Sequence, residues 1–308
     1  MDKAVYVFPG QASQYVGMGR ELYEKSDRVK DFYRQASDLL GDDLARISFD
    51  GPTETLKQTK FTQPAILVHS LALLDIIGKK LPKPLFTAGH SLGEYAALVA
   101  SGALNFEDAI TAVCHRAMLM EKACVENPGT MAAIMAFDTD KLKKICEDTP
   151  GIVTLANINS SLQVAVSGEI EAVEKVAARA KEAGAKRAIV LEVGGAFHSP
   201  LMASARNGLA DCLKKLTIGE ARPEVIANVT AQPVSDPATI EKLLVEQITS
   251  PVRWLDTMEY FKTQGVTQLI EIGPGRVLTG LAKREMPGVE LLNVDKLEDI
   301  TKIKALVS

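Results

Sequence analysis

The segment TAGHSLGEYAALVASGAL, residues 87–104, contains Ser91 in a Gly-x-Ser-x-Gly pattern between Gly89 and Gly93. A short apolar run precedes the pattern, and an alanine-rich stretch with helical spacing follows it. Many enzymes present a nucleophile on such a strand-to-helix turn, where flanking glycines allow close backbone packing. A serine that merely caps a helix is the alternative. The strand before and the helix after favour a nucleophile.

A serine nucleophile needs a base, and the chain has four histidines. His198 follows an apolar strand in the glycine-flanked loop GGAFHSPLM, from which it could reach the end of a neighbouring strand. His69 is expected to pack in an apolar helix, His90 to pack beside the site, and His115 to be half-exposed on a helix. His198 is therefore the predicted base. The acidic residues between Ser91 and His198 fit helix caps, so we expect a Ser–His dyad whose imidazole is not oriented by a carboxylate.

Two backbone N–H groups are candidates for an oxyanion hole. Leu92 would begin the helix after Ser91, so its N–H would point at an oxyanion beside the serine. Gln11 follows the first predicted strand and a Pro-Gly turn, which puts it at the same end of the sheet as Ser91. A plain connection between a strand and a loop is the alternative for Gln11.

Arg116 lies at the edge of the apolar stripe of a helix predicted over residues 106–124, and Met120 belongs to that stripe. Asn105, with Asp108 three residues later, is expected to cap this helix. An arginine among small apolar residues calls for a carboxylate or a phosphate in its guanidinium fork. A surface arginine whose head group reaches solvent explains the pattern equally well at this level.

The elements that must position these residues alternate between short apolar strands and helices. Continuous apolar runs of this kind are typical of strands buried on both faces, which predicts a parallel sheet covered by helices. The runs are residues 4–8, 85–89, 188–193, 224–228 and 268–272.

One region of the chain has its own order of elements. Residues 131–193 read as strand, helix, strand, strand, helix, strand, which is the ferredoxin-like βαββαβ unit. We therefore predict a large α/β domain from residues 1–127 and 194–308, with a small domain inserted at 128–193. The active cleft is expected where the two domains meet.

Composition limits the classes of partner. The net charge of −4 over 308 residues gives no general attraction for nucleic acid or an anionic membrane. The longest apolar stretch, residues 64–77, is too short to span a bilayer and is predicted to be a core helix. The four cysteines show no paired spacing and MDKAVYVFPG is no signal peptide, which indicates reduced thiols in a cytoplasmic protein. No metal site is predicted.

Several segments together resemble one family. They are FPGQASQYVGMG, TQPAILVHSLAL, GHSLGEYAALVASGAL, Arg116, GAFHSPLM, SPVRW and EIGPGRVLTGL. In this order, from residue 5 to about 284, they resemble the malonyl-CoA:acyl-carrier-protein transacylases and the related acyltransferase domains of fatty acid and polyketide synthases. The fold of that family is a hydrolase-like parallel-sheet α/β domain with a ferredoxin-like insert.

The resemblance implies a role for each matched residue. Ser91 would accept the acyl group, and His198 would act as general base and then as general acid. The backbone N–H groups of Gln11 and Leu92 would form the oxyanion hole. Arg116 would bind the free carboxylate of the malonyl group.

Further residues are implied to orient the base or contact the substrate. Gln247 would hold the histidine through its main-chain carbonyl, which fits the missing acid. Asn157 and Asn159 match positions near the cleft, and Phe197 matches the phenylalanine of malonyl-selective domains. Met120 is also expected to contact the substrate.

The implied reaction is a ping-pong transfer from malonyl-CoA to acyl carrier protein, with no cofactor in the enzyme itself, because the phosphopantetheine belongs to the carrier. A serine hydrolase or thioesterase is the alternative, and a non-catalytic carrier-binding module is the alternative outside enzymes.

Overall fold

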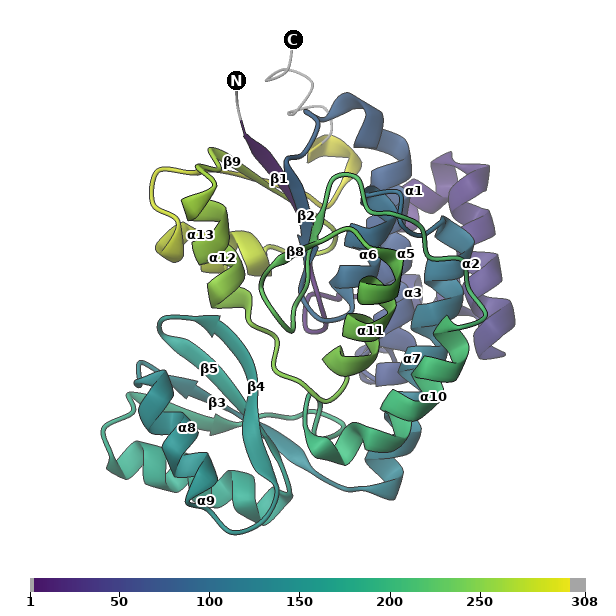
Figure 1. The fold of residues 1–308 in the computed structure, drawn as a ribbon. Coiled ribbons are helices and arrows are strands. Elements are labelled where there is room, and N and C mark those ends of the chain that lie inside the picture. Colours follow the sequence, from purple (N-terminus) through teal and green to yellow (C-terminus); the bar gives the residue numbers. More distant parts are fainter. Residues whose placement is uncertain (1–2, 300–308) are drawn as a thin grey trace.

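The computed structural model describes residues 3–299 and contains two sheets. The larger sheet has six strands in the order β10-β9-β1-β2-β7-β8 (Figure 1). The strands from β10 to β7 are parallel, and β8 pairs antiparallel with β7 at one edge. The strands are β1 (Ala4–Phe8), β2 (Phe86–Gly89), β7 (Val225–Ile226), β8 (Pro233–Val234), β9 (Gln268–Ile272) and β10 (Glu290–Val294).

Helices cover both faces of this sheet (Figure 1). In β1, Tyr6 and Phe8 pack into the core formed with α5 and α6, while Val5 and Val7 pack into the core formed with α12 and α13. The strand is therefore buried on both faces, as its continuous apolar run predicts. The helices of this part are α1 (Arg20–Lys25), α2 (Asp27–Leu40), α3 (Leu44–Asp50), α4 (Thr53–Leu56), α5 (Thr59–Ile77), α6 (Gly93–Ala100), α7 (Phe106–Glu126), α10 (Ala203–Leu213), α11 (Pro237–Gln247), α12 (Trp254–Thr263) and α13 (Val277–Glu285).

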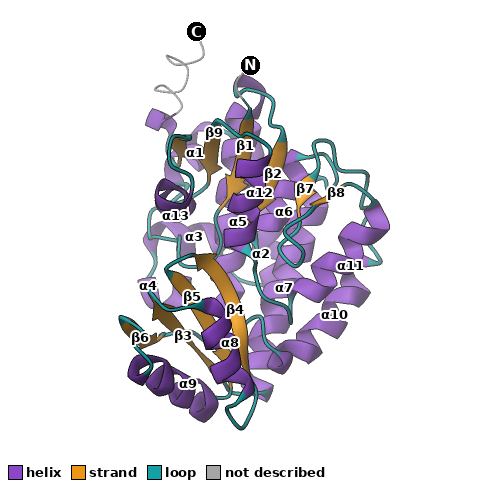
Figure 2. Cartoon of the chain, turned by 60° about the vertical axis from the view of Figure 1, so that its left-hand side comes forward, coloured by secondary structure: helices purple, strands orange, loops and turns teal. Residues whose placement is uncertain are grey.

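The smaller sheet is antiparallel, with strand order β4-β5-β3-β6, and the helices α8 and α9 lie against it (Figure 2). Its elements are β3 (Thr130–Met135), α8 (Thr139–Glu147), β4 (Val153–Ser160), β5 (Gln163–Gly168), α9 (Ile170–Glu182) and β6 (Arg187–Val190). This is the βαββαβ order expected. The predicted α/β class with a second, smaller sheet is confirmed. The domain limits stay a prediction. Residues 1–2 and 300–308 of the predicted large domain lie outside the described residues.

The small sheet makes a short backbone pairing with the segment between α11 and α12. The N–H of Ile158 in β4 donates to the carbonyl of Val252, and the N–H of Val252 donates to Ala156, over 2.9 and 2.8 Å. Val252 follows α11, so this pairing joins the small sheet to the segment just after Gln247.

Some predicted elements differ in the structure. The run at 188–193 is the edge strand β6, ending at Val190, and not a strand buried on both faces: Ile189 and Val190 are 48% and 45% exposed. The run at 224–228 forms only the two-residue β7, because the chain turns back at once into β8. The larger sheet is therefore parallel except at β8. The strand β10 was not among the predicted runs.

The core helix begins earlier than expected. It starts at Thr59, before Pro64, and is long and apolar enough to cross a membrane by length and composition alone. However, 78% of its apolar window is buried inside the protein. It packs against α7, so its apolar side chains belong to the protein core.

Candidate active site

Ser91 lies on a sharp turn between β2 and α6. Its φ angle is 52°, in the left-handed region that residues other than glycine rarely adopt. The flanking glycines allow this turn: a Cβ on Gly89 would lie 2.0 Å from the carbonyl carbon of Gly93, and one on Gly93 would lie 2.2 Å from the oxygen of Phe8. The close packing predicted from the two glycines is confirmed.

His198 faces Ser91 from the loop that returns from the small sheet. The Oγ of Ser91 lies 2.8 Å from Nε2 of His198, and Nδ1 of His198 lies 2.8 Å from the carbonyl oxygen of Gln247. Gln247 is the last residue of α11, where carbonyls lack partners within the helix. A carbonyl accepts only, so Nδ1 carries the proton and Nε2 is left to accept the proton of Ser91.

The environment keeps the imidazole of His198 neutral. Burial, followed by the nearby charge of Arg116, lowers the pKa of His198 to about 3. A neutral imidazole can accept a proton, so the side chain is ready as a base over the whole neutral range.

The rate of Ser91 acylation should therefore stay level as pH falls from 8 to 5, because the base form of His198 is lost only near its depressed pKa. The measurement is kcat/KM for acylation, which reports on the free enzyme. A fall with a midpoint between 6 and 7 that persists in Glu94→Gln would contradict this prediction. Glu94→Gln serves as the control, since an inflection near pH 7 that this variant abolishes belongs to Glu94.

Arg116 enters the same site from α7. It is 1% exposed, and its Nη2 donates to Ser91 Oγ and to Gln247 Oε1, both at 3.0 Å. Its Nη1 donates to Gln63 Oε1, while Nε, also buried, has no partner among the described residues. Its hydrogen-bond partners are all neutral, and burial lowers the pKa of the guanidinium. The alternative of a surface arginine is therefore wrong: the guanidinium is a buried cation beside the nucleophile.

Glu94 places a buried carboxyl group behind the site. Its Oε2 accepts from Gln247 Nε2 at 2.8 Å and from the N–H of Asn228 at 3.1 Å. Burial raises the pKa of Glu94 to about 7, although the two hydrogen bonds and the charge of Arg116 oppose the shift. The side chain of Gln247 thus connects the carboxyl of Glu94 with the guanidinium of Arg116.

A cavity of about 630 Å³ opens in front of the dyad. The small sheet supplies one wall, and the loop after β1 and the helix α13 supply another. Of the predicted residues, those that line it are Gln11, Ser91, Leu92, Arg116, Met120, Asn157, Asn159, Phe197 and His198. Gln247 is fully buried behind them. The structure therefore brings all the predicted site residues to one place.

Two of these residues also support neighbouring side chains. Asn159 Oδ1 lies 2.8 Å from Nε2 of His90, which is half-buried and packs beside Ser91 as expected. The sulfur of Met120 accepts from Gln63 Nε2 at 3.5 Å.

Leu92 directly precedes α6, so its N–H belongs to the helix start, where no acceptor within the helix is available. These N–H groups are the ones that can face an oxyanion.

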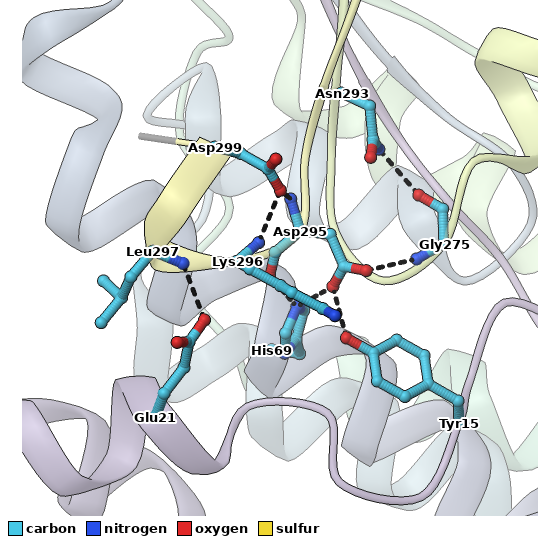
Figure 3. A network of polar contacts seen from close by, with 9 residues as sticks. All are labelled: Tyr15, Glu21, His69, Gly275, Asn293, Asp295, Lys296, Leu297 and Asp299. Atoms are coloured by element: carbon cyan, nitrogen blue, oxygen red, sulfur yellow. Dashed lines mark hydrogen bonds and ion pairs between the residues drawn. The ribbon is translucent and has the colours of Figure 1, made fainter. Parts of the chain in front are cut away.

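The other histidines lie outside the cavity lining. His115 is half-buried on α7. His69 is buried in α5, where its Nε2 lies 3.0 Å from Asp295 Oδ1. That carboxylate also accepts from the hydroxyl of Tyr15 and the N–H of Gly275 (Figure 3). The network ties together the loops after β1, β9 and β10, and the loop after β1 borders the cavity.

Sequence reasoning missed three polar residues around the dyad, namely Gln63, Glu94 and Asn228. Each carries a weak signal. Gln63 is the amide that directly precedes the apolar run of α5, and Glu94 is a lone carboxyl in the alanine-rich α6. Asn228 follows the short β7, which ends at the same side of the sheet as β2.

Comparisons with known proteins agree with this geometry. The model of the acyl transferase domain family matches residues 5–295. The chain is 42% identical over 303 residues to the malonyl CoA-acyl carrier protein transacylase of Bacillus subtilis, covering 97% of this chain and 96% of that protein. It is 41% identical to the enzyme of the same description from Haemophilus influenzae, covering 99% of each.

Solved structures share the whole fold. An acyl-carrier-protein S-malonyltransferase from Bartonella henselae superimposes with a TM-score of 0.94 at 38% identity, covering 99% of both chains. A malonyl-transacylase solved in complex with its type II PKS acyl-carrier protein superimposes with a TM-score of 0.93 at 39% identity, covering 99% of this chain and 100% of that one. The chain therefore belongs to the acyl transferase family and, within it, to the malonyl-CoA:acyl-carrier-protein transacylases.

Proposed function

We propose that this protein transfers the malonyl group of malonyl-CoA to the phosphopantetheine thiol of an acyl carrier protein, for fatty acid or polyketide synthesis. One observation carries the proposal beyond the relatives' names. The guanidinium of Arg116 is buried 3.0 Å from the Oγ of Ser91 and has only neutral hydrogen-bond partners. A buried cation at the nucleophile calls for an acyl group that brings its own carboxylate.

The first half-reaction forms a malonyl ester on Ser91. His198 Nε2 takes the hydroxyl proton while Oγ attacks the thioester carbonyl, and the N–H groups of Gln11 and Leu92 stabilise the oxyanion. The C–S bond then breaks, and the CoA sulfur leaves as a thiol with the proton from His198. Arg116 holds the malonyl carboxylate throughout.

The second half-reaction runs in the same site. The carrier thiol gives its proton to His198 and attacks the ester carbonyl, and Ser91 leaves with that proton. The carbonyl of Gln247 keeps the imidazole in the tautomer that both steps need and stabilises the imidazolium that each step forms. The enzyme needs no cofactor of its own, since the phosphopantetheine belongs to the carrier.

The remaining site residues have positional roles in this scheme. Asn157 and Asn159 lie on the wall toward the small sheet, where they can contact the pantetheine chain, and Phe197 and Met120 bound the acyl pocket. We infer a cytoplasmic setting, which the four free cysteines support.

Incubation with malonyl-CoA should add one malonyl group to the intact mass, and peptide mapping should locate it on Ser91. Ser91→Ala should show no adduct, and added holo acyl carrier protein should discharge the wild-type adduct to the carrier. Release of malonate to water as fast as to the carrier would instead identify a hydrolase or thioesterase. The absence of any adduct would leave only a binding module.

A further inference from the structure

The side chain of Asn228 spans the turn that carries Ser91. Its Oδ1 accepts from the N–H of Ser91 at 2.7 Å, and its Nδ2 donates to the carbonyl of Gly89 at 2.6 Å. Its own N–H donates to Glu94 Oε2, and its carbonyl accepts from the N–H of Arg253. Asn228 is 1% exposed, and the cavity lining in the described chain does not include it.

The turn needs such a partner because regular structure ends there. The ladder between β2 and β7 stops at the pair Ala88 and Ile226, so β7 offers no backbone partner for Gly89 or Ser91. At a φ of 52°, Ser91 has left the strand without yet joining the helix. A buried N–H and a buried carbonyl would otherwise lack partners, which native proteins avoid. One amide supplies the acceptor and the donor together.

We propose that Asn228 is a positioning residue that fixes the turn around Ser91, and through it the distance from Oγ to His198 and the direction of the Leu92 N–H. This inference rests on the proposed function, because it concerns acylation of Ser91. Asn228 acts only through the backbone of the turn. The contacts of Arg116 with Gln63 and Gln247, and with them the choice between malonyl and acetyl groups, should not depend on it.

The amide matters for its polarity as well as its shape. Asn228→Asp keeps the shape, but an ionised carboxylate has only acceptors and would repel the carbonyl of Gly89. A protonated carboxyl again offers one donor and one acceptor. Burial beside Glu94 will hold the pKa of the introduced carboxyl above its usual range. The defect of the variant should therefore disappear as pH falls.

Asn228→Asp should acylate Ser91 about 10²-fold more slowly than wild type at pH 8, because small displacements in a reacting pair cost about this much. The ratio of variant to wild-type rate should rise about tenfold or more by pH 5. The ratio of malonyl to acetyl transfer should equal that of wild type. Asn207→Asp, the same change at an exposed position of α10, should match wild type at every pH.

Other titratable groups near the turn are Glu94 on α6, Arg116 on α7, and His90 and His198 on loops. Arg253, at the start of α12, pairs with Asp256. All of them are present in both proteins, so the ratio of rates removes the pH effects that the two share. Repeating the series in a Glu94→Gln background should leave the direction of the recovery unchanged.

The experiment also separates this inference from the proposed function. Labelling of Ser91 by a fluorophosphonate reports on the nucleophile without malonyl-CoA, and should be slowed in Asn228→Asp at pH 8 and recover at pH 5. If wild type is labelled but never malonylated, the proposed function fails and this test still decides the role of Asn228.

Wild-type rates for Asn228→Asp at pH 8, or a loss that does not recover at pH 5, would overturn the proposal. A changed malonyl to acetyl ratio would also overturn it, since Asn228 would then act through Arg116. If Asn228→Asp does not fold at pH 8, Asn228→Ala replaces it and should be slow at both pH values without recovery. Failure of both variants to fold at either pH would mean that Asn228 serves the whole fold and would contradict a positioning role.

Discussion

Arg116→Ala should lower the rate of malonyl transfer by about 10²-fold or more, while the rate of acetyl transfer stays the same or rises. The guanidinium offers a malonyl carboxylate two charge-assisted hydrogen bonds, each contributing about 1.5–3 kcal/mol, and about 1.4 kcal/mol corresponds to a factor of ten. An acetyl group brings no anion, so in wild type it leaves a buried cation unpaired. Removing that cation removes the discrimination against acetyl.

The measurement is kcat/KM for both acyl-CoAs, together with the melting temperature of each variant. Arg116→Lys is the matched control, since it keeps the charge but loses the planar fork that also holds Gln63 and Gln247. It should retain part of the malonyl activity and still discriminate against acetyl. Equal losses for both substrates in Arg116→Ala would show that the arginine is structural.

His198→Ala should slow formation of the malonyl adduct by roughly 10²- to 10⁴-fold, the usual contribution of a positioned general base. Among the described residues, Ser91 Oγ would then lack a hydrogen-bonded side chain able to accept its proton, because Arg116, its other contact, is a donor. Quenched-flow mass spectrometry of the adduct measures this step directly. A change of less than about tenfold would mean that another group takes the serine proton.

Gln247→Ala provides a matched comparison at the residue whose carbonyl contacts His198. It removes the side-chain amide between Arg116 and Glu94 but keeps the main-chain carbonyl that orients His198. The variant should therefore lose less of the base function than His198→Ala does. Its malonyl preference should weaken, because Arg116 loses one of its fixed partners.

The Ser91 turn is the part of the site that local sequence specifies most fully. Gly89 and Gly93 are needed because atoms of Gly93 and Phe8 occupy the positions of their missing side chains. The apolar run before the turn and the alanine-rich run after it are contiguous in the chain, so the strand and the helix could be predicted. The loop position of His198 followed from the strand before it, although that strand proved to be an exposed edge.

The sequence by itself determined the α/β class, the small βαββαβ unit and the choice of Ser91 and His198 as candidate nucleophile and base, because periodicity and turn chemistry depend on neighbouring residues. The tertiary structure alone decided that Arg116 is buried, since its partners come from α5 and α11. It alone brought Asn228 to Ser91 and Glu94, across sequence separations of 137 and 134 residues. Hydrogen bonds between distant elements depend on where those elements pack, and no local pattern encodes that.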